Sequence, residues 1–164
     1  MKIMIKVGFI GAGDIAYLHG EGVQATSNAR LHGIWNRTRV KAEEKASLFD
    51  TQVFDTPAEL IEAVDVVYVL TNMETHHAFC MQAIEAGKHV LVEKPTAITI
   101  QEIEEIKAFA LQKGVQVAPV HNYVYETPVM RAKELIKSGK LGNLVSIYVL
   151  YNIHHPEKVA ARYP

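Results

Sequence analysis

Residues 5–16 read IKVGFIGAGDIA, an apolar run that leads directly into a glycine-rich turn. The run Ile3–Ile10 predicts a β-strand, and residues 14–25 after the turn predict a helix. Between them, Gly11–Ala16 match the pattern G-x-G-x-x-A, which in a strand–turn–helix context is typical of a dinucleotide-binding turn. A plain structural turn is the alternative, because glycines often follow strands.

Each position of this pattern has a physical reason when a dinucleotide binds. Gly11 allows the tight turn, and Gly13 leaves room for the pyrophosphate. The helix that opens at Asp14 and Ile15 directs free N–H groups toward phosphate oxygens, while Ala16 lets helix and strand pack closely. We therefore expect Gly11, Gly13, Asp14 and Ile15 to contact the cofactor.

Strand-like and helix-like segments alternate along the chain as far as residue 120. Six strands are expected, at residues 3–10, 31–36, 52–54, 65–71, 89–93 and 115–120. Helices are expected at residues 14–25, 38–49, 75–87 and 99–114, and a short one opens at the capping box Thr56–Glu59. This alternation predicts an α/β fold of the Rossmann type, a doubly wound parallel sheet with helices on both faces.

Composition excludes several classes of protein. The 164 residues carry 17 Lys+Arg against 18 Asp+Glu, so no basic excess points to a nucleic-acid partner. No run approaches the roughly 18 apolar residues of a membrane span. The single cysteine, Cys80, excludes an internal disulfide and suits a reducing cytoplasm, which we take as the expected location. Its apolar neighbours indicate a small core residue.

The end of the second expected strand bears on the choice of cofactor. A carboxylate that binds both hydroxyls of the adenosine ribose is usual there, but this chain has Asn36 followed by Arg37. Asn36 can bond one hydroxyl, and Arg37 can pair with a 2′-phosphate or stack on adenine. We favour NADP over NAD, although Arg37 and Arg39 could merely begin a solvated helix.

Lys94 follows the apolar strand HVLVE in the sequence Glu93-Lys94-Pro95. Ligands of open α/β sheets bind off the carboxyl ends of the strands, and Lys94 lies at such an end. An ammonium there can bond a substrate hydroxyl or carbonyl, so Lys94 is the candidate catalytic residue. The proline fixes the turn and is a candidate for a cis peptide bond.

Other polar residues also end strands or occur in pairs. Thr71-Asn72 and His121-Asn122 end the fourth and sixth strands, and His121 and Asn122 are candidate substrate contacts, with an ordinary loop as the alternative. The pairs His76-His77 and His154-His155 lack a carboxylate or cysteine at ligand spacing, so no metal site is expected.

Three segments together resemble the Gfo/Idh/MocA family of NAD(P)-dependent oxidoreductases: GFIGAGDIA at 8–16, AIEAGKHVLVEKPTAITIQEIEEI at 83–106 and AKELIKSGKLGNLVSI at 132–147. The resemblance implies hydride transfer between nicotinamide C4 and a carbinol carbon of a sugar- or polyol-like substrate. It implies that Lys94 of the E-K-P motif contacts both substrate and cofactor, and Glu93 of the same motif is a candidate cofactor contact. The family's T-P-N-x-x-H pattern is matched here at Thr71 and His76, while Asn72 stands where the pattern is altered. Thr71, Asn72 and His76 are further candidate cofactor contacts.

The resemblance also implies two domains, a Rossmann domain at 1–120 and the start of an incomplete α/β domain at 121–164. A helix at Thr127–Ser138, capped by Thr127, and a strand at Leu144–Tyr151 are expected in the second part. This segment is expected either to pair with the same segment of another copy of the chain or to be disordered. The family's second acid/base group is expected beyond residue 164, so this chain is expected to bind cofactor and to be inactive alone. The alternative is a non-catalytic nucleotide-binding sensor or regulatory module.

Overall fold

The computed structural model describes residues 3–150 and residue 152. The chain divides into two compact units, one up to His121 and one from Asn122 onward. The first unit contains the sheet and the helices that cover it, and the second contains η2 (Asn122–Tyr125) and α6 (Thr127–Lys137).

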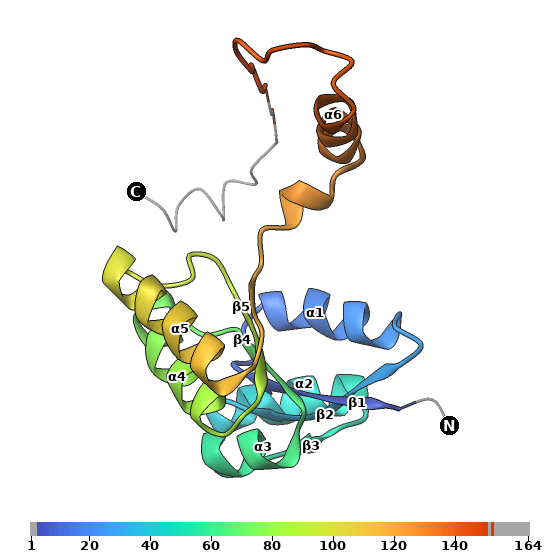
Figure 1. Cartoon of the computed structure of the whole chain (residues 1–164). Helices are drawn as coiled ribbons and strands as arrows, with labels where there is room; N and C mark the ends of the chain where they lie inside the picture. The colour runs from blue at the N-terminus through green and yellow to red at the C-terminus, as the bar shows by residue number, and fades with distance from the viewer. Residues whose placement is uncertain (1–2, 151, 153–164) are drawn as a thin grey trace. The chain divides into compact units, whose positions relative to one another are not determined.

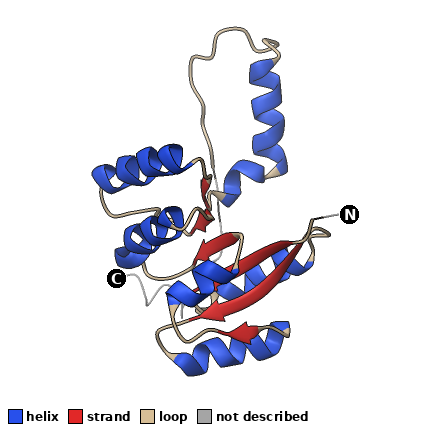
Figure 2. Ribbon diagram, turned by 60° about the horizontal axis from the view of Figure 1, so that its bottom comes forward, coloured by secondary structure: helices blue, strands red, loops and turns tan. Residues whose placement is uncertain are grey.

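The first unit is built on a six-stranded parallel sheet in the order β3-β2-β1-β4-β5-β6. Figure 2 shows strands in red. Its strands are β1 (Ile5–Ile10), β2 (Ala29–Trp35), β3 (Gln52–Val53), β4 (Val66–Val69), β5 (His89–Val92) and β6 (Val117–Pro119). The chain winds outward from β1 through β2 and β3, then returns to place β4 on the other side of β1. This reversal is that of a Rossmann fold and confirms the predicted fold class.

Helices cover both faces of the sheet (Figure 1). The helices α1 (Ile15–Gln24) and α2 (Arg39–Phe49) share one apolar cluster with β1 and β2. The helices α3 (Pro57–Ala63), α4 (His76–Glu85) and α5 (Ile100–Lys113) share the other with β4 and β5; a short 3-10 turn, η1 (Met73–Thr75), precedes α4. Along β4, Val67 and Val69 face the second cluster while Val66 and Tyr68 face the first, so both faces of the strand are covered.

Two of the expected helix starts, those of α3 and α5, have side-chain caps. Thr56 Oγ1 accepts the N–H of Glu59 at 3.2 Å. Thr99 Oγ1 accepts the N–H of Glu102, and Glu102 in return accepts the N–H of Thr99, which completes a capping box. The N–H groups of Thr99 and then Ile98 lower the pKa of the Glu102 carboxyl.

The second unit departs from the sequence prediction in two places. The N-cap of α6 is Glu126, and not Thr127, which is already the first helical residue. Residues 144–150 form no strand; Tyr151 lies outside the described residues. A strand needs a partner that takes up its N–H and C=O groups, and apolar β-branched residues alone do not supply one. Val145 and Tyr148 there are 96% and 94% exposed.

Within the described part of the chain, no helix combines the length and apolar character that crossing a membrane requires.

Cys80 gives a chemical test of the packing between α4 and the sheet. The side chain is fully buried, and burial raises the pKa of its thiol to about 12. The thiol is therefore neutral at pH 8, and a thiolate is the species that reacts. We expect the native protein to resist Ellman's reagent at pH 8 and to react once unfolded in urea. Rapid stoichiometric reaction of the native protein would show that α4 is not packed as described.

Candidate cofactor-binding site

Gly11 is required by the backbone itself. It has φ +114°, and a Cβ atom at this position would lie 2.6 Å from the carbonyl oxygen of Leu70. Its N–H donates to the carbonyl oxygen of Trp35 at 2.8 Å. Gly11 therefore lets the turn after β1 pass between the ends of β2 and β4, where no other residue fits.

Gly13 differs from Gly11, because nothing within the chain requires a glycine there. No described atom lies within 4 Å of the place that its Cβ would take, and its φ is not in the left-handed region. The N–H groups of Gly13 and Ile15 make no hydrogen bond within residues 3–150, and they lie at the N-terminus of the 10-residue helix α1. An open cradle lined by free N–H groups at a helix N-terminus fits an anionic pyrophosphate. Asp14 is the N-cap residue of this helix.

Asn36 ties the end of β2 to the glycine loop. Its Oδ1 accepts the N–H of Ala12 at 3.1 Å, and its Nδ2 donates to the carbonyl oxygen of Thr38 at 2.9 Å. Part of the amide that was expected to face a ribose hydroxyl is thus used inside the protein. Arg37 is exposed and makes no ion pair among the described residues, whereas Arg39 pairs with Glu43 and Asp55. The solvated-helix interpretation holds for Arg39, and Arg37 remains available to a ligand.

His76 is almost fully buried and holds two ends of the site together. Its Nδ1 lies 2.8 Å from the carbonyl oxygen of Pro95, and its Nε2 lies 3.0 Å from that of Thr71. Because carbonyl oxygens only accept, a neutral imidazole can donate to one of them at a time. The imidazole links the end of β4 to the turn after β5, so His76 acts inside the protein. Direct contacts of Thr71, Asn72 and His76 with a cofactor remain predictions.

The turn after β5 presents Lys94 to solvent. The N–H of Glu93 donates to the carbonyl oxygen of Val69 at 3.0 Å, which continues the pairing of β4 with β5, and the Lys94–Pro95 peptide bond is cis. Lys94 is exposed, and within residues 3–150 its ammonium has no ion-pair partner. Glu93, in contrast, is 8% exposed and points inward, so its contact with a cofactor also remains a prediction.

His121 follows β6 as Lys94 follows β5, at the same carboxyl edge of the sheet. Val92 and Pro119 are the last pair in register, and Lys94 and His121 each come two residues later in the chain. Both are exposed. Asn122 already belongs to the second unit, where it begins η2, so its expected role as a substrate contact rests on the sequence alone.

The described residues contain no group of three His, Cys, Asp or Glu side chains that could hold an ion. His77 Nε2 lies 3.0 Å from Glu105 Oε2 in an ion-pair contact whose angle does not satisfy a hydrogen bond. His154 and His155 lie outside the described residues.

His19 is a part of the site that the sequence analysis missed. It projects from α1 toward the sheet, and its Nε2 bonds the Glu93 carboxylate at 2.9 Å. Its position three residues after Ala16, on the buried stripe formed by Ala16, Gly20 and Val23, could have indicated an inward-facing histidine.

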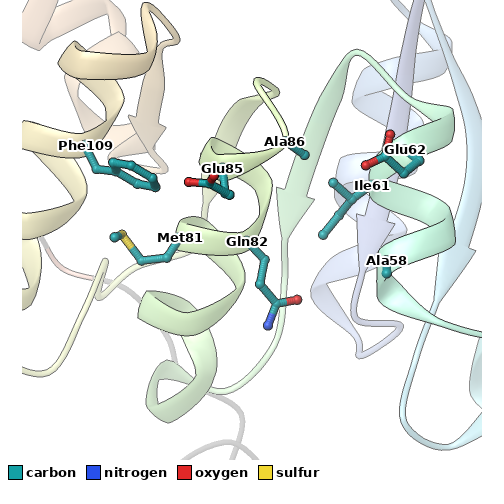
Figure 3. A pocket seen from close by; sticks show the side chains of 8 residues that line it. All are labelled: Ala58, Ile61, Glu62, Met81, Gln82, Glu85, Ala86 and Phe109. Carbon is teal, nitrogen blue, oxygen red and sulfur yellow. The ribbon is translucent and has the colours of Figure 1, made fainter.

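A separate pocket of about 600 Å³ lies among α3, α4 and α5 (Figure 3). Met81 of α4 and Phe109 of α5 point toward each other on one side, and Ile61 of α3 lies on the other. The α4 residues that line it belong to the C-terminal half of that helix and its cap, away from the strand ends that carry the glycine loop and Lys94. This pocket is therefore not the candidate cofactor site.

The fold and the open glycine cradle at its carboxyl edge define a dinucleotide-binding Rossmann protein. The model of the Gfo/Idh/MocA oxidoreductase family with an NAD-binding Rossmann fold matches residues 5–121. The chain belongs to this family, and NAD or NADP fits its site.

Two relatives from Bacillus subtilis (strain 168) are dehydrogenases. Glucose-6-phosphate 3-dehydrogenase is 36% identical over 146 residues, which are 89% of this chain and 42% of the relative. The scyllo-inositol 2-dehydrogenase (NADP(+)) IolW is 33% identical over 162 residues, which are 97% of this chain and 44% of the relative. The chain thus spans less than half the length of either.

Solved structures agree on the fold. GenD2 from gentamicin A biosynthesis, in complex with NAD, matches with a TM-score of 0.79 and 29% identity, over 84% of this chain and 40% of that one. The scyllo-inositol dehydrogenase of Lactobacillus casei with NAD(H) and scyllo-inositol has a TM-score of 0.77 at 23% identity, over 85% of this chain and 43% of that one, and shows the fold alone.

Gly13→Val tests the cradle directly. The new side chain enters open space, so the fold should persist, but it fills the volume that a pyrophosphate needs. Losing two charge-assisted hydrogen bonds should weaken NADPH binding by about a hundredfold. Fluorescence titration measures this affinity. Gly22→Val is the matched control, because Gly22 also faces open space, further along α1. Equal NADPH affinity in both variants would reduce the loop to a plain turn.

Proposed function

We propose that this chain is the cofactor-binding part of an NAD(P)-dependent oxidoreductase that acts on a sugar- or polyol-like carbinol. The observation that carries the proposal is the placement of Lys94 and the glycine cradle on one edge of the sheet, the carboxyl edge, after β5 and β1. The two Bacillus relatives are named as dehydrogenases of a sugar phosphate and of an inositol, and these names support this substrate class.

In this proposal the chain's own residues bind the cofactor, orient the substrate and hold a proton. The N–H groups of Gly13 and Ile15 receive the pyrophosphate, and Lys94 Nζ donates to the oxygen of the reacting carbinol or carbonyl. The bound nicotinamide would supply the hydride chemistry. His121, which follows the strand next to β5, is the proposed neighbour of the substrate, and Asn122 is a further proposed substrate contact.

For cofactor choice we propose NADP over NAD. No carboxylate follows β2 to bind a ribose diol or repel a 2′-phosphate, and the Arg37 guanidinium is exposed without an ion-pair partner in the described part of the chain. Planar guanidinium groups suit phosphate recognition.

For the 164 residues by themselves we propose cofactor binding without turnover. What supports this part of the proposal is the family resemblance, from which we expect the second acid/base group outside these residues, together with the need of Lys94 for such a partner and for a substrate-holding wall. Self-association of the exposed segment 144–150 and a cytoplasmic location are further parts of the proposal. The first rests on exposed apolar side chains and the second on the lone cysteine.

The catalytic proposal is tested by joining this chain to the second domain of the scyllo-inositol 2-dehydrogenase relative. Nicotinamide absorbance is followed with a panel of polyols and sugars. We expect turnover by the joined protein, none by the chain alone, and a fall in kcat of about a hundredfold to ten-thousandfold for Lys94→Met. Lys107→Met on the exposed face of α5 is the control. Cofactor binding with no turnover by the joined protein would favour the sensor function, and unchanged turnover in Lys94→Met would remove the lysine from the mechanism.

Arg37→Ala tests the proposed preference for NADP. The loss of a charge-assisted contact to the 2′-phosphate should lower NADP affinity about tenfold to a hundredfold and leave NAD affinity nearly unchanged. Arg39→Ala should change neither, because Arg39 pairs with Glu43 and Asp55. Asn36→Asp should shift preference toward NAD, with some loss of stability, since the bond from Nδ2 to the Thr38 carbonyl oxygen is lost. An unchanged ratio of NADP to NAD affinity in Arg37→Ala and Asn36→Asp would contradict the assignment.

A further inference from the structure

His19 is held in one orientation by aromatic side chains beneath α1. Its ring meets Tyr68 edge-on at a centroid distance of 5.6 Å and Phe9 at 6.4 Å, while Phe9 and Tyr68 stack on each other at 5.3 Å. Burial raises the pKa of the Tyr68 hydroxyl. The imidazole therefore has little freedom to turn away from the sheet.

The Glu93 carboxylate uses both of its oxygens inside the protein. His19 Nε2 donates to Oε1 at 2.9 Å, and the backbone N–H of Lys94 donates to Oε2 at 3.0 Å. The His19 and Glu93 side chains are only 14% and 10% exposed. A carboxylate so far removed from water needs such partners, and hydrogen bonds to a charged group are stronger than those between neutral groups.

The carboxylate thereby connects two parts of the site that are far apart in sequence. On one side is α1, whose N-terminus forms the phosphate cradle, and on the other is the backbone of Lys94. We propose that His19 is a positioning residue: through Glu93 it fixes the backbone at Lys94, so that the ammonium is directed to the nicotinamide and substrate end of the cofactor. This inference rests on the proposed function, since it assumes that Lys94 acts there.

The link from His19 through the Glu93 carboxylate to the Lys94 backbone can be tested without any cofactor. In the parent chain the Lys94 amide is hydrogen-bonded to Glu93 and should exchange slowly with solvent deuterium. His19→Leu removes the donor to Oε1 and frees the carboxylate, so we expect exchange at Lys94 about tenfold faster. His19→Gln, which retains an N–H donor, should restore slow exchange. His77→Leu is the matched control, because it removes the other His–Glu contact, between α4 and α5.

Binding measurements separate positioning from packing. NADPH and 2′-phospho-ADP-ribose share the phosphates, but only NADPH has the nicotinamide. If His19 positions Lys94, His19→Leu should weaken NADPH binding about tenfold and leave 2′-phospho-ADP-ribose binding unchanged. In a Lys94→Met background the effect of His19→Leu on NADPH affinity should disappear. The ammonium that His19 is proposed to position is already absent there, so its contact with NADPH cannot be lost a second time.

Each outcome decides the proposal. Faster exchange at Lys94 with a selective loss of NADPH affinity, both rescued by His19→Gln, supports it. Equal weakening of both ligands shows that His19 only packs α1 against the sheet and overturns it, as does unchanged exchange at Lys94. If the parent binds neither ligand, the proposed binding of NADP fails, and the exchange result alone decides whether His19 fixes the backbone at Lys94.

Discussion

The close approach of Gly11 to the carbonyl oxygen of Leu70 is the constraint on which this site depends. β1 is paired with β2 on one side and β4 on the other, and the turn after β1 must pass between the ends of both neighbours. A side chain at Gly11 would collide with the backbone of Leu70 and Thr71, directly after β4. Because glycine resolves the collision, α1 can begin directly at the carboxyl edge, where its free N–H groups face the space that a pyrophosphate needs.

The part of the site around Lys94 depends on buried polar groups. Among the described residues the buried polar side chains are His76 and Glu93, and both hold the turn that carries Lys94. His76 binds the carbonyl of Pro95, and Glu93 binds the N–H of Lys94. Buried polar groups are costly unless they are satisfied, and here they fix the backbone on either side of one exposed lysine. A flexible side chain on a fixed backbone is a suitable arrangement for a proton donor.

Local patterns in the sequence were sufficient to predict the sheet and most helix starts, because apolar periodicity, capping residues and glycines act over a few positions. Gly11 and Gly13 look identical in sequence, yet the first serves the backbone and the second leaves space for a ligand, a distinction that appears only when β4 is in place. His19 was missed because its partner, Glu93, lies 74 positions away. The strand expected at Leu144–Tyr151 is absent in residues 144–150, since apolar composition cannot show whether a partner strand exists.

The central claim is that one dinucleotide lies along the carboxyl edge, from the glycine cradle to Lys94. It is tested most directly by titrating the isotope-labelled chain with NADPH and following every backbone amide by NMR. The account predicts that the amides of Gly13 and Ile15 shift together with those of Lys94 and His121, at a single common affinity, while amides around Phe109 stay unchanged. Shifts confined to the pocket among α3, α4 and α5, or no saturable shift at Gly13, would contradict it.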